Sequence, residues 1–91
     1  PRPVRSVKLR ADVFEHRASQ RTAQGLIQAA YRLEEGVLRS VELSGPVPPG
    51  LAESLEGLSR NEAAKLLLGR IPPGLEAKNW LGIFGIRPSI F

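Results

Sequence analysis

The chain has 91 residues, a formal net charge of +4, 42% hydrophobic residues and no cysteine. This length supports one domain with one core, so we expect a single accessory or binding domain over residues 1–91. No segment approaches the roughly 18 apolar residues of a membrane span. The lack of cysteine excludes disulfides, thiolate metal sites and thiol catalysis, and it fits a reducing compartment. We therefore expect a cytoplasmic protein with no membrane contact.

The positive charge is concentrated in the first third of the chain. Residues 1–32 carry seven Arg or Lys against Asp12 and Glu15, a local excess of +5. A basic surface of this kind attracts nucleic acid or an acidic protein through a salt-sensitive field. An ordinary solvated strand face has the same composition. Both interpretations stay open at this point.

The first predicted element is a strand that begins near Ser6. Apolar residues alternate with polar ones from there to Val13, which is the period of a strand with one buried face. The strand is expected to end at Val13 or to run on to Phe14 or Glu15. Residues 16–24 are polar and lack a strong apolar period, so they predict an exposed connection.

The stretch Gly25 to Gly45 predicts a β-hairpin. Apolar residues alternate on both sides of the turn Glu34-Glu35-Gly36, which is the signature of two paired, half-buried strands. Two inward-facing sets are expected, namely Ile27, Ala29, Tyr31 and Leu33 before the turn and Val37, Val41 and Leu43 after it. A hairpin alone is marginal in water, so it needs a third strand or a helix against its apolar face.

Helices follow the hairpin. The proline- and glycine-rich run 45–50 ends the sheet, and leucines at 51, 55 and 58 recur at helical spacing. The sequence Ser59-Arg60-Asn61-Glu62 matches a capping box for a second helix that stops near Gly69. Leu75 to Phe84 is the segment of a last short helix. The fold class expected is therefore α+β, a three-stranded antiparallel sheet followed by two or three helices packed on one face.

The chain offers few groups for catalysis. His16 is the only histidine, which excludes a Ser-His-Asp arrangement or a His-rich metal site within this chain, and its polar surroundings predict an ordinary surface histidine. Adjacent glutamates at the 34–35 turn are expected to be solvated. No phosphate-binding glycine loop is present. We expect a binding, accessory or structural domain with no catalytic residues, no metal and no cofactor of its own.

The hairpin also carries a resemblance to a known family. The succession Gly25-Leu26-Ile27, an alternating strand, an acidic turn with Gly36, a second strand, Ser44-Gly45 and a leucine helix resembles the C-terminal accessory domain of lipoate-protein ligases. The likeness covers roughly residues 4–68. Pro46-Val47-Pro48 stands where the family has an Asp and two aromatic residues, and Gln24 replaces the first glycine of a pair. Related iron–sulfur scaffolds need cysteine ligands, which this chain lacks.

The resemblance implies a non-catalytic accessory subunit of a two-part, ATP-dependent lipoate-protein ligase. A large catalytic subunit would be its partner and would bind lipoate and ATP with Mg, while the small chain would assist formation of lipoyl-adenylate. The lipoyl acceptor domain is a second candidate partner. Interface candidates are the basic first strand and the apolar C-terminal part, namely Arg5, Lys8, Arg10, Trp80, Phe84 and Phe91. The alternative is a small basic nucleic-acid-binding or protein-interaction module; the scarcity of aromatic residues favours a protein over RNA.

Overall fold

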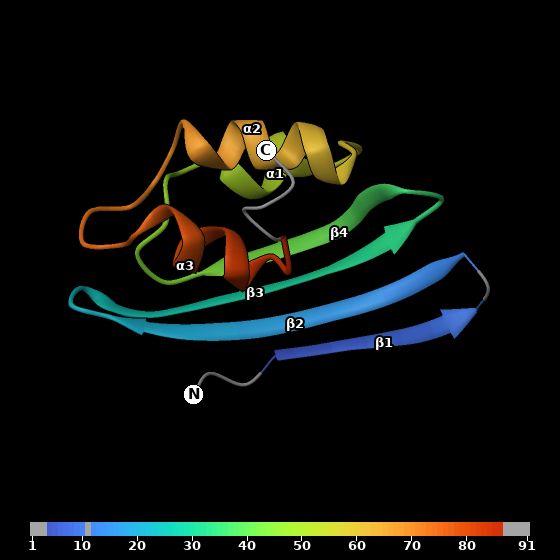
Figure 1. Ribbon diagram of the computed structural model, residues 1–91, viewed down its shortest axis with the longest axis horizontal. Helices are drawn as coiled ribbons and strands as arrows, with labels where there is room; N and C mark the ends of the chain where they lie inside the picture. The colour runs from blue at the N-terminus through green and yellow to red at the C-terminus, as the bar shows by residue number, and fades with distance from the viewer. Residues whose placement is uncertain (1–3, 11, 87–91) are drawn as a thin grey trace.

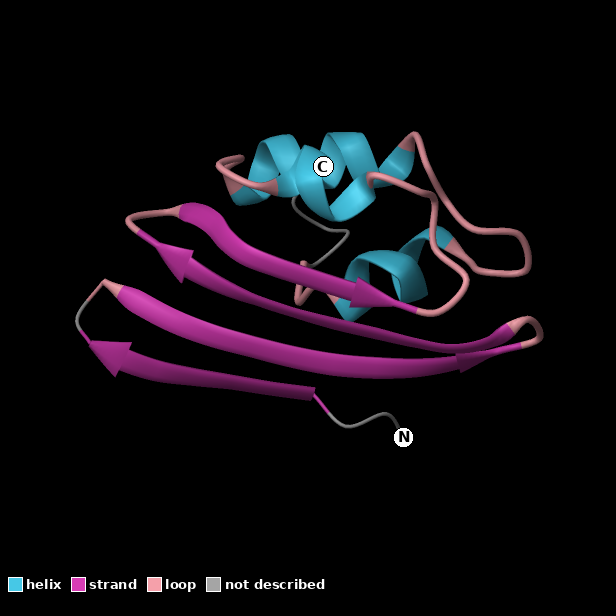
Figure 2. Cartoon of the chain, turned by 180° about the vertical axis from the view of Figure 1, so that it is seen from behind, coloured by secondary structure: helices cyan, strands magenta, loops and turns pink. Residues whose placement is uncertain are grey.

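The computed structural model describes the backbone of residues 4–10 and the whole of residues 12–86. Four strands precede three helices (Figure 1). The elements are β1 (Val4–Arg10), β2 (Val13–Thr22), β3 (Gly25–Glu34), β4 (Val37–Ser44), α1 (Leu51–Leu55), α2 (Arg60–Leu68) and α3 (Ala77–Ile83). The strands pair in the order β1-β2-β3-β4, each antiparallel to the next (Figure 2). The expected α+β class, an antiparallel sheet with helices on one side, is confirmed, and the sheet holds one strand more than the three expected.

The additional strand is β2, where the sequence predicted an exposed connection over residues 16–24. That prediction is wrong, because β2 runs to Thr22 and pairs along its whole length with β3. The first strand is correspondingly shorter than expected and ends at Arg10. The polar residues of β2 hid its period. Its outward residues face no helix, and its inward face is built from His16 and the small Ala18, both buried.

The predicted hairpin is present as β3 and β4. Glu35 and Gly36 have φ of 52° and 81°, the two positive values that a two-residue type I′ turn requires. The register of β4 shifts opposite Tyr31, where Ser40 adopts a φ of 53° and forms a β-bulge. Because the bulge reverses the alternation, Leu38 is the inward residue at the start of β4. The expectation that Val37 faces inward is therefore wrong.

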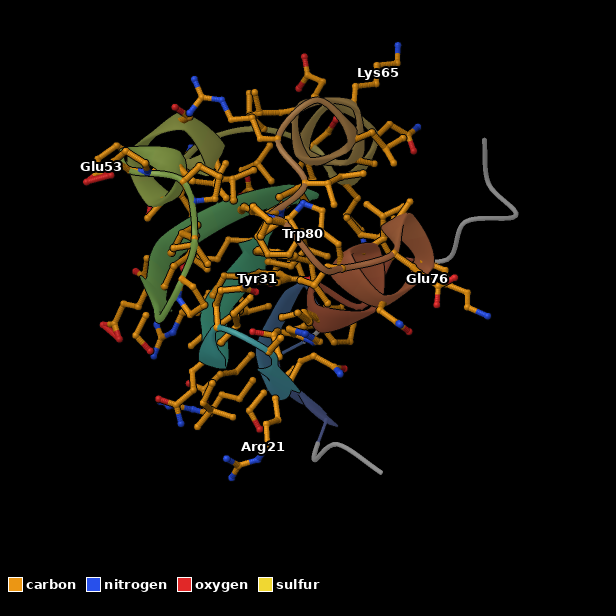
Figure 3. All side chains as sticks on the ribbon, turned by 90° about the vertical axis from the view of Figure 1, so that its left-hand side faces the viewer. Arg21, Tyr31, Glu53, Lys65, Glu76 and Trp80 are labelled. Atoms are coloured by element: carbon orange, nitrogen blue, oxygen red, sulfur yellow. The ribbon has the colours of Figure 1, made fainter. Side chains whose placement is uncertain are left out.

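The core lies between the sheet and the helix layer. In Figure 3, Tyr31 and Trp80 lie in this space, whereas Arg21 and Lys65 lie at opposite outer sides of the molecule. The largest fully buried side chains come from β3, β4 and all three helices: Trp80, Phe84, Ile27, Leu38, Leu51, Leu55, Leu67, Leu81 and Ile83. A hairpin that could not fold alone is stabilised by helices that cover its apolar face.

The helices begin and end close to where the sequence predicts. Ser59 accepts a hydrogen bond from the Glu62 amide at 3.2 Å, and the Glu62 carboxylate accepts one from the Ser59 amide at 3.0 Å, so the capping box is confirmed. The hydrogen bonds lower the pKa of the Glu62 carboxyl below its usual value. The helix stops at Gly69, as expected, and α3 is shorter than the Leu75–Phe84 segment proposed for it.

The two edges of the sheet differ. The outer edge of β4 is covered, because the Leu38 amide donates to the Leu58 carbonyl at 2.8 Å and the Leu38 carbonyl accepts from the Gly57 amide at 2.7 Å. An isolated bridge joins Val37 to Ser59 beside them. On the opposite side, β1 is the end strand of the sheet, and within residues 4–10 and 12–86 no further strand pairs with it.

Candidate functional site

The buried polar groups of the sheet hold the end of α3. The His16 imidazole lies 2.8 Å from the Ile83 carbonyl through Nε2, and the Tyr31 hydroxyl donates to the Phe84 carbonyl at 2.6 Å. A carbonyl only accepts, so Nε2 of His16 carries the proton. The two rings lie side by side with centroids 4.8 Å apart. Gly85 leaves room for this pair, since a Cβ there would lie 2.9 Å from His16 Cε1.

Two further side chains satisfy helix-end carbonyls. Arg60, the first residue of α2, donates to the Gly85 carbonyl at 3.0 Å, and Trp80 Nε1 donates to the Leu67 carbonyl at 2.9 Å. The first contact joins α2 to the segment after α3, and the second joins α3 to the last turn of α2.

The electrostatics of this cluster keep its rings neutral. Burial, followed by the positive charge of Arg60, lowers the pKa of His16 below its ordinary value of 6.5, against the opposing effect of its hydrogen bond to Ile83. Burial raises the pKa of the Tyr31 hydroxyl above 10.0. His16 is only 3% exposed, so the prediction of a surface histidine is wrong. The cluster orders the fold and presents no reactive group to solvent.

A carboxylate holds the bulge in β4. Glu56 follows α1, and its Oε1 accepts from the Ser40 amide at 3.1 Å while its Oε2 accepts from the Val41 amide. The bulge turns both amides away from β3, so the ladder cannot satisfy them. Glu56 thus stabilises the bulge.

The open face of the sheet, on the side away from the helices, carries a hollow. It has a volume of about 510 Å³ and spans β2, β3 and β4. Ala30 lines it, and in the strand register it pairs with Arg17 on β2 and with Glu42 on β4. The lining residues are Arg17, Ala18, Ser19, Gln28, Ala29, Ala30, Glu42, Leu43 and Ser44. The small side chain of Ala30 lies between residues of opposite charge, an arrangement that suits contact with another polar surface.

A second hollow lies at the end of the molecule where β4 leaves the sheet. It has a volume of about 500 Å³ and is lined mainly by prolines from the loops after β4 and after α2, together with Val47, Arg70 and Ile71. The Pro46-Val47-Pro48 segment that departs from the lipoate-ligase pattern forms one wall. Its lining carries no carboxylate or imidazole, so it offers no acid–base chemistry.

The interface candidates from the sequence are not brought together. Arg5, Lys8 and Arg10 belong to β1, the end strand of the sheet. Trp80 and Phe84 are 0% exposed and pack edge-to-face with ring centroids 5.2 Å apart. They are core residues, so their proposed role as interface residues is wrong for this conformation. Phe91 lies outside the described residues.

The structural glycines predicted in the hairpin occupy its turns. Gly25 begins β3 with a φ of 133°, and Gly36 completes the type I′ turn. Gly45, with a φ of 96°, packs so closely that a Cβ would lie 2.1 Å from the Leu26 carbonyl oxygen. Between these turns Ile27 is fully buried, while Leu26 is exposed on the open face.

The open face is the surface that sequence reasoning missed. Its residues on β2 lie in the segment interpreted as a connection, so their alignment with β4 could not be foreseen. The weak alternation of Phe14, His16 and Ala18 with charged or polar residues is the only local signal that could have revealed this strand.

The described part of the chain shows neither a metal-binding cluster nor a helix that could span a membrane. Within residues 12–86, no group of three or more His, Cys, Asp or Glu side chains could hold a metal ion. No helix there is long and apolar enough to cross a membrane. Comparison of the chain with protein-family models, curated proteins and solved structures finds no significant match.

Proposed function

We propose that this chain is a protein-binding accessory domain, and specifically the small subunit of a two-part lipoate-protein ligase in the cytosol. The observation that carries a binding role is the contrast between the sheet edges. The β4 edge is closed by residues 57–59, whereas β1 is the end strand and contains Arg5, Lys8 and Arg10. An end strand with unpaired backbone groups accepts a strand from a partner, and basic residues along it favour an acidic one.

The lipoate-ligase assignment is supported by the order of elements in the hairpin region. A glycine opens β3, an acidic turn with Gly36 follows, Gly45 ends β4, and a short helix with buried leucines comes next. This is the order that the resemblance implies. The large subunit would then bind lipoate and ATP with Mg, and this chain would assist activation through contact alone.

The test is reconstitution with the large ligase-like protein of the same organism. The expected result is a complex and faster formation of lipoyl-adenylate from lipoate and ATP. The β1 variant Arg5→Glu/Lys8→Glu/Arg10→Glu should lose both. The matched control Lys65→Glu/Arg70→Glu/Lys78→Glu makes the same change of charge at exposed helix-layer positions and should retain both.

Two results would contradict the proposal in different ways. Unchanged adenylation with no complex would remove the accessory role altogether. A functional complex that the β1 variant and its control affect equally would keep the accessory role and exclude β1 as the contact.

The described surface does not favour the nucleic-acid alternative. On the open face, Arg17 lies beside Glu15 at 3.6 Å and across Ala30 from Glu42. Carboxylates interleaved with arginines repel a phosphate backbone. The single tryptophan and the single tyrosine are both buried, so neither can stack on a base.

A further inference from the structure

On the open face of the sheet, the two strands that flank β3 carry opposite charges in each of two neighbouring rows. In the strand register, one row across the sheet runs from Arg17 on β2 through Ala30 on β3 to Glu42 on β4. The neighbouring row runs from Glu15 on β2 through Arg32 to Arg39. The sign on β2 is therefore opposite to the sign on β4 in each row.

The third row continues the pattern with polar residues. Ser19 on β2 pairs with Gln28, which pairs with Ser44 on β4. The Ser44 hydroxyl donates to Gln28 Oε1 at 3.3 Å, so both side chains lie on this face. Across β3, an Arg on β2 therefore lies in the same row as a Glu on β4, a Glu on β2 in the same row as an Arg on β4, and a Ser in the same row as a Ser.

From this arrangement we propose that the open face binds the open face of a second copy of this chain. A twofold axis that runs along β3 between two stacked sheets places β2 of one copy over β4 of the other, and Ala30 over its own copy. Arg17 then faces Glu42 of the other copy, twice by symmetry, and Glu15 faces Arg39 in the same way. Such an isologous contact needs a self-complementary surface, which this face provides.

The small side chains and the charges of the open face both allow two such sheets to stack closely. Stacked sheets lie about 10 Å apart, which small side chains at the centre permit, and Ala30 and Ser19 line the hollow there. Within one chain Arg32 and Arg39 are opposite neighbours of like charge, a destabilising pair. Glu15 of the second copy would neutralise Arg39. Arg32 would face its own copy, with Glu34 two residues away along β3.

A twofold axis across the strands would give different contacts. Through the Arg17 row it would place Arg17 over Arg17 and Glu42 over Glu42, which like charges oppose. Between this row and the Glu15 row it would place Arg17 over Glu15 and Glu42 over Arg39. The double variant Arg17→Glu/Glu42→Arg distinguishes that arrangement, because its exchanged charges would then face like charges. The footprint is small, about 14 Å along three strands that lie about 4.8 Å apart. This size belongs to weak interfaces, so the dimer is expected to form in a concentration-dependent way.

The experiment measures the mass of the purified chain by sedimentation velocity, up to about 1 mM protein at low and at high salt. The expected result is twice the 9.9 kDa chain mass at high protein concentration, with weaker association at high salt. Arg17→Glu and Glu42→Arg should each shift the dissociation constant upward at least about tenfold. The double variant Arg17→Glu/Glu42→Arg should restore association, because the exchanged charges again face each other.

The control variant is Lys78→Glu, which makes the same change of charge as Arg17→Glu on the exposed helix layer and should dimerise like the original chain. A chain that stays monomeric throughout would overturn the proposal. So would equal weakening by Arg17→Glu and Lys78→Glu, or a double variant that does not recover. The measurement uses the isolated chain, so its failure is separate from any failure of the lipoate-ligase proposal, on which the dimer does not rest.

Discussion

Polar residues have different roles on the two faces of the sheet. On the helix-covered face, His16, Tyr31 and Arg60 each contact a backbone carbonyl near the end of α3. Within the described residues no buried side-chain nitrogen or oxygen lacks a hydrogen bond. On the open face the charged side chains are exposed, and the one ion pair found among the described residues joins Glu15 to Arg17. From this difference we expect substitutions on the first face to change folding and substitutions on the second to change the proposed association.

The largest expected effect comes from the centre of the covered face. Trp80→Ala removes the largest buried side chain, its contact with Phe84 and its hydrogen bond to the Leu67 carbonyl. The free energy of unfolding should fall by about 3–5 kcal/mol, measured by denaturant titration. The open-face control Arg17→Ala should change it by less than about 0.5 kcal/mol. Similar losses in the two variants would contradict the expectation that the covered face stabilises the fold and the open face does not.

A second effect separates the two hairpin glycines. In Gly45→Ala the new Cβ would meet the Leu26 carbonyl oxygen, and the positive φ adds strain, so we expect a loss of about 3 kcal/mol. In Gly36→Ala the space is open, and the cost should be about 1 kcal/mol from backbone strain alone. Thermal or denaturant unfolding of both variants measures the difference. Equal losses would show that the close contact of a Cβ at position 45 with the Leu26 carbonyl oxygen adds no cost to the free energy of unfolding.

Local sequence patterns predict the parts of the fold that depend on neighbouring residues, and they fail where a residue packs against a distant segment. The hairpin, the capping box at Ser59 and the stop at Gly69 depend on neighbouring residues, and each is found where the sequence predicts it. The strand β2 is different, because one of its faces is exposed and its inward face includes His16. A polar residue becomes an inward residue only when a distant carbonyl, here that of Ile83, lies opposite it.

The same reason explains the errors at the candidate site. Trp80 and Phe84 are apolar residues near the end of the chain, and the sequence alone does not distinguish core from interface there. The bulge at Ser40 depends on the Glu56 carboxylate, which comes from a separate element, so the reversed alternation of β4 has no local signal. The charge pattern of the open face depends on the pairing register and follows only from the structure.

A smaller effect is expected from a single hydroxyl of the covered face. Tyr31→Phe keeps the ring but leaves the Phe84 carbonyl without its donor, so the free energy of unfolding should fall by about 1–3 kcal/mol. The matched control is Ser54→Ala, which removes an exposed hydroxyl that donates to the Gly50 carbonyl at 3.0 Å and should cost less than about 0.5 kcal/mol. A Tyr31→Phe variant as stable as the original chain would mean that water replaces the hydroxyl.

The smallest expected effect is a dependence of stability on pH through His16. Burial lowers the pKa of His16 in the folded chain below the ordinary 6.5 of the unfolded chain. As pH falls below about 6.5, the unfolded state therefore binds a proton that the folded state does not, and stability declines until the folded pKa is reached. The decline contributed by this group cannot exceed about 1.4 kcal/mol per pH unit.

His16→Gln isolates this contribution from the titration of the carboxylates. A glutamine amide can also donate to the Ile83 carbonyl, but it does not titrate. Urea titrations at several pH values between 7.5 and 5 should therefore show the stability advantage of the original chain over His16→Gln shrinking as pH falls. A constant difference across this range would show that His16 is not held neutral by the fold. Arg17→Gln on the open face should leave the pH dependence as it is, because arginine stays charged throughout this range.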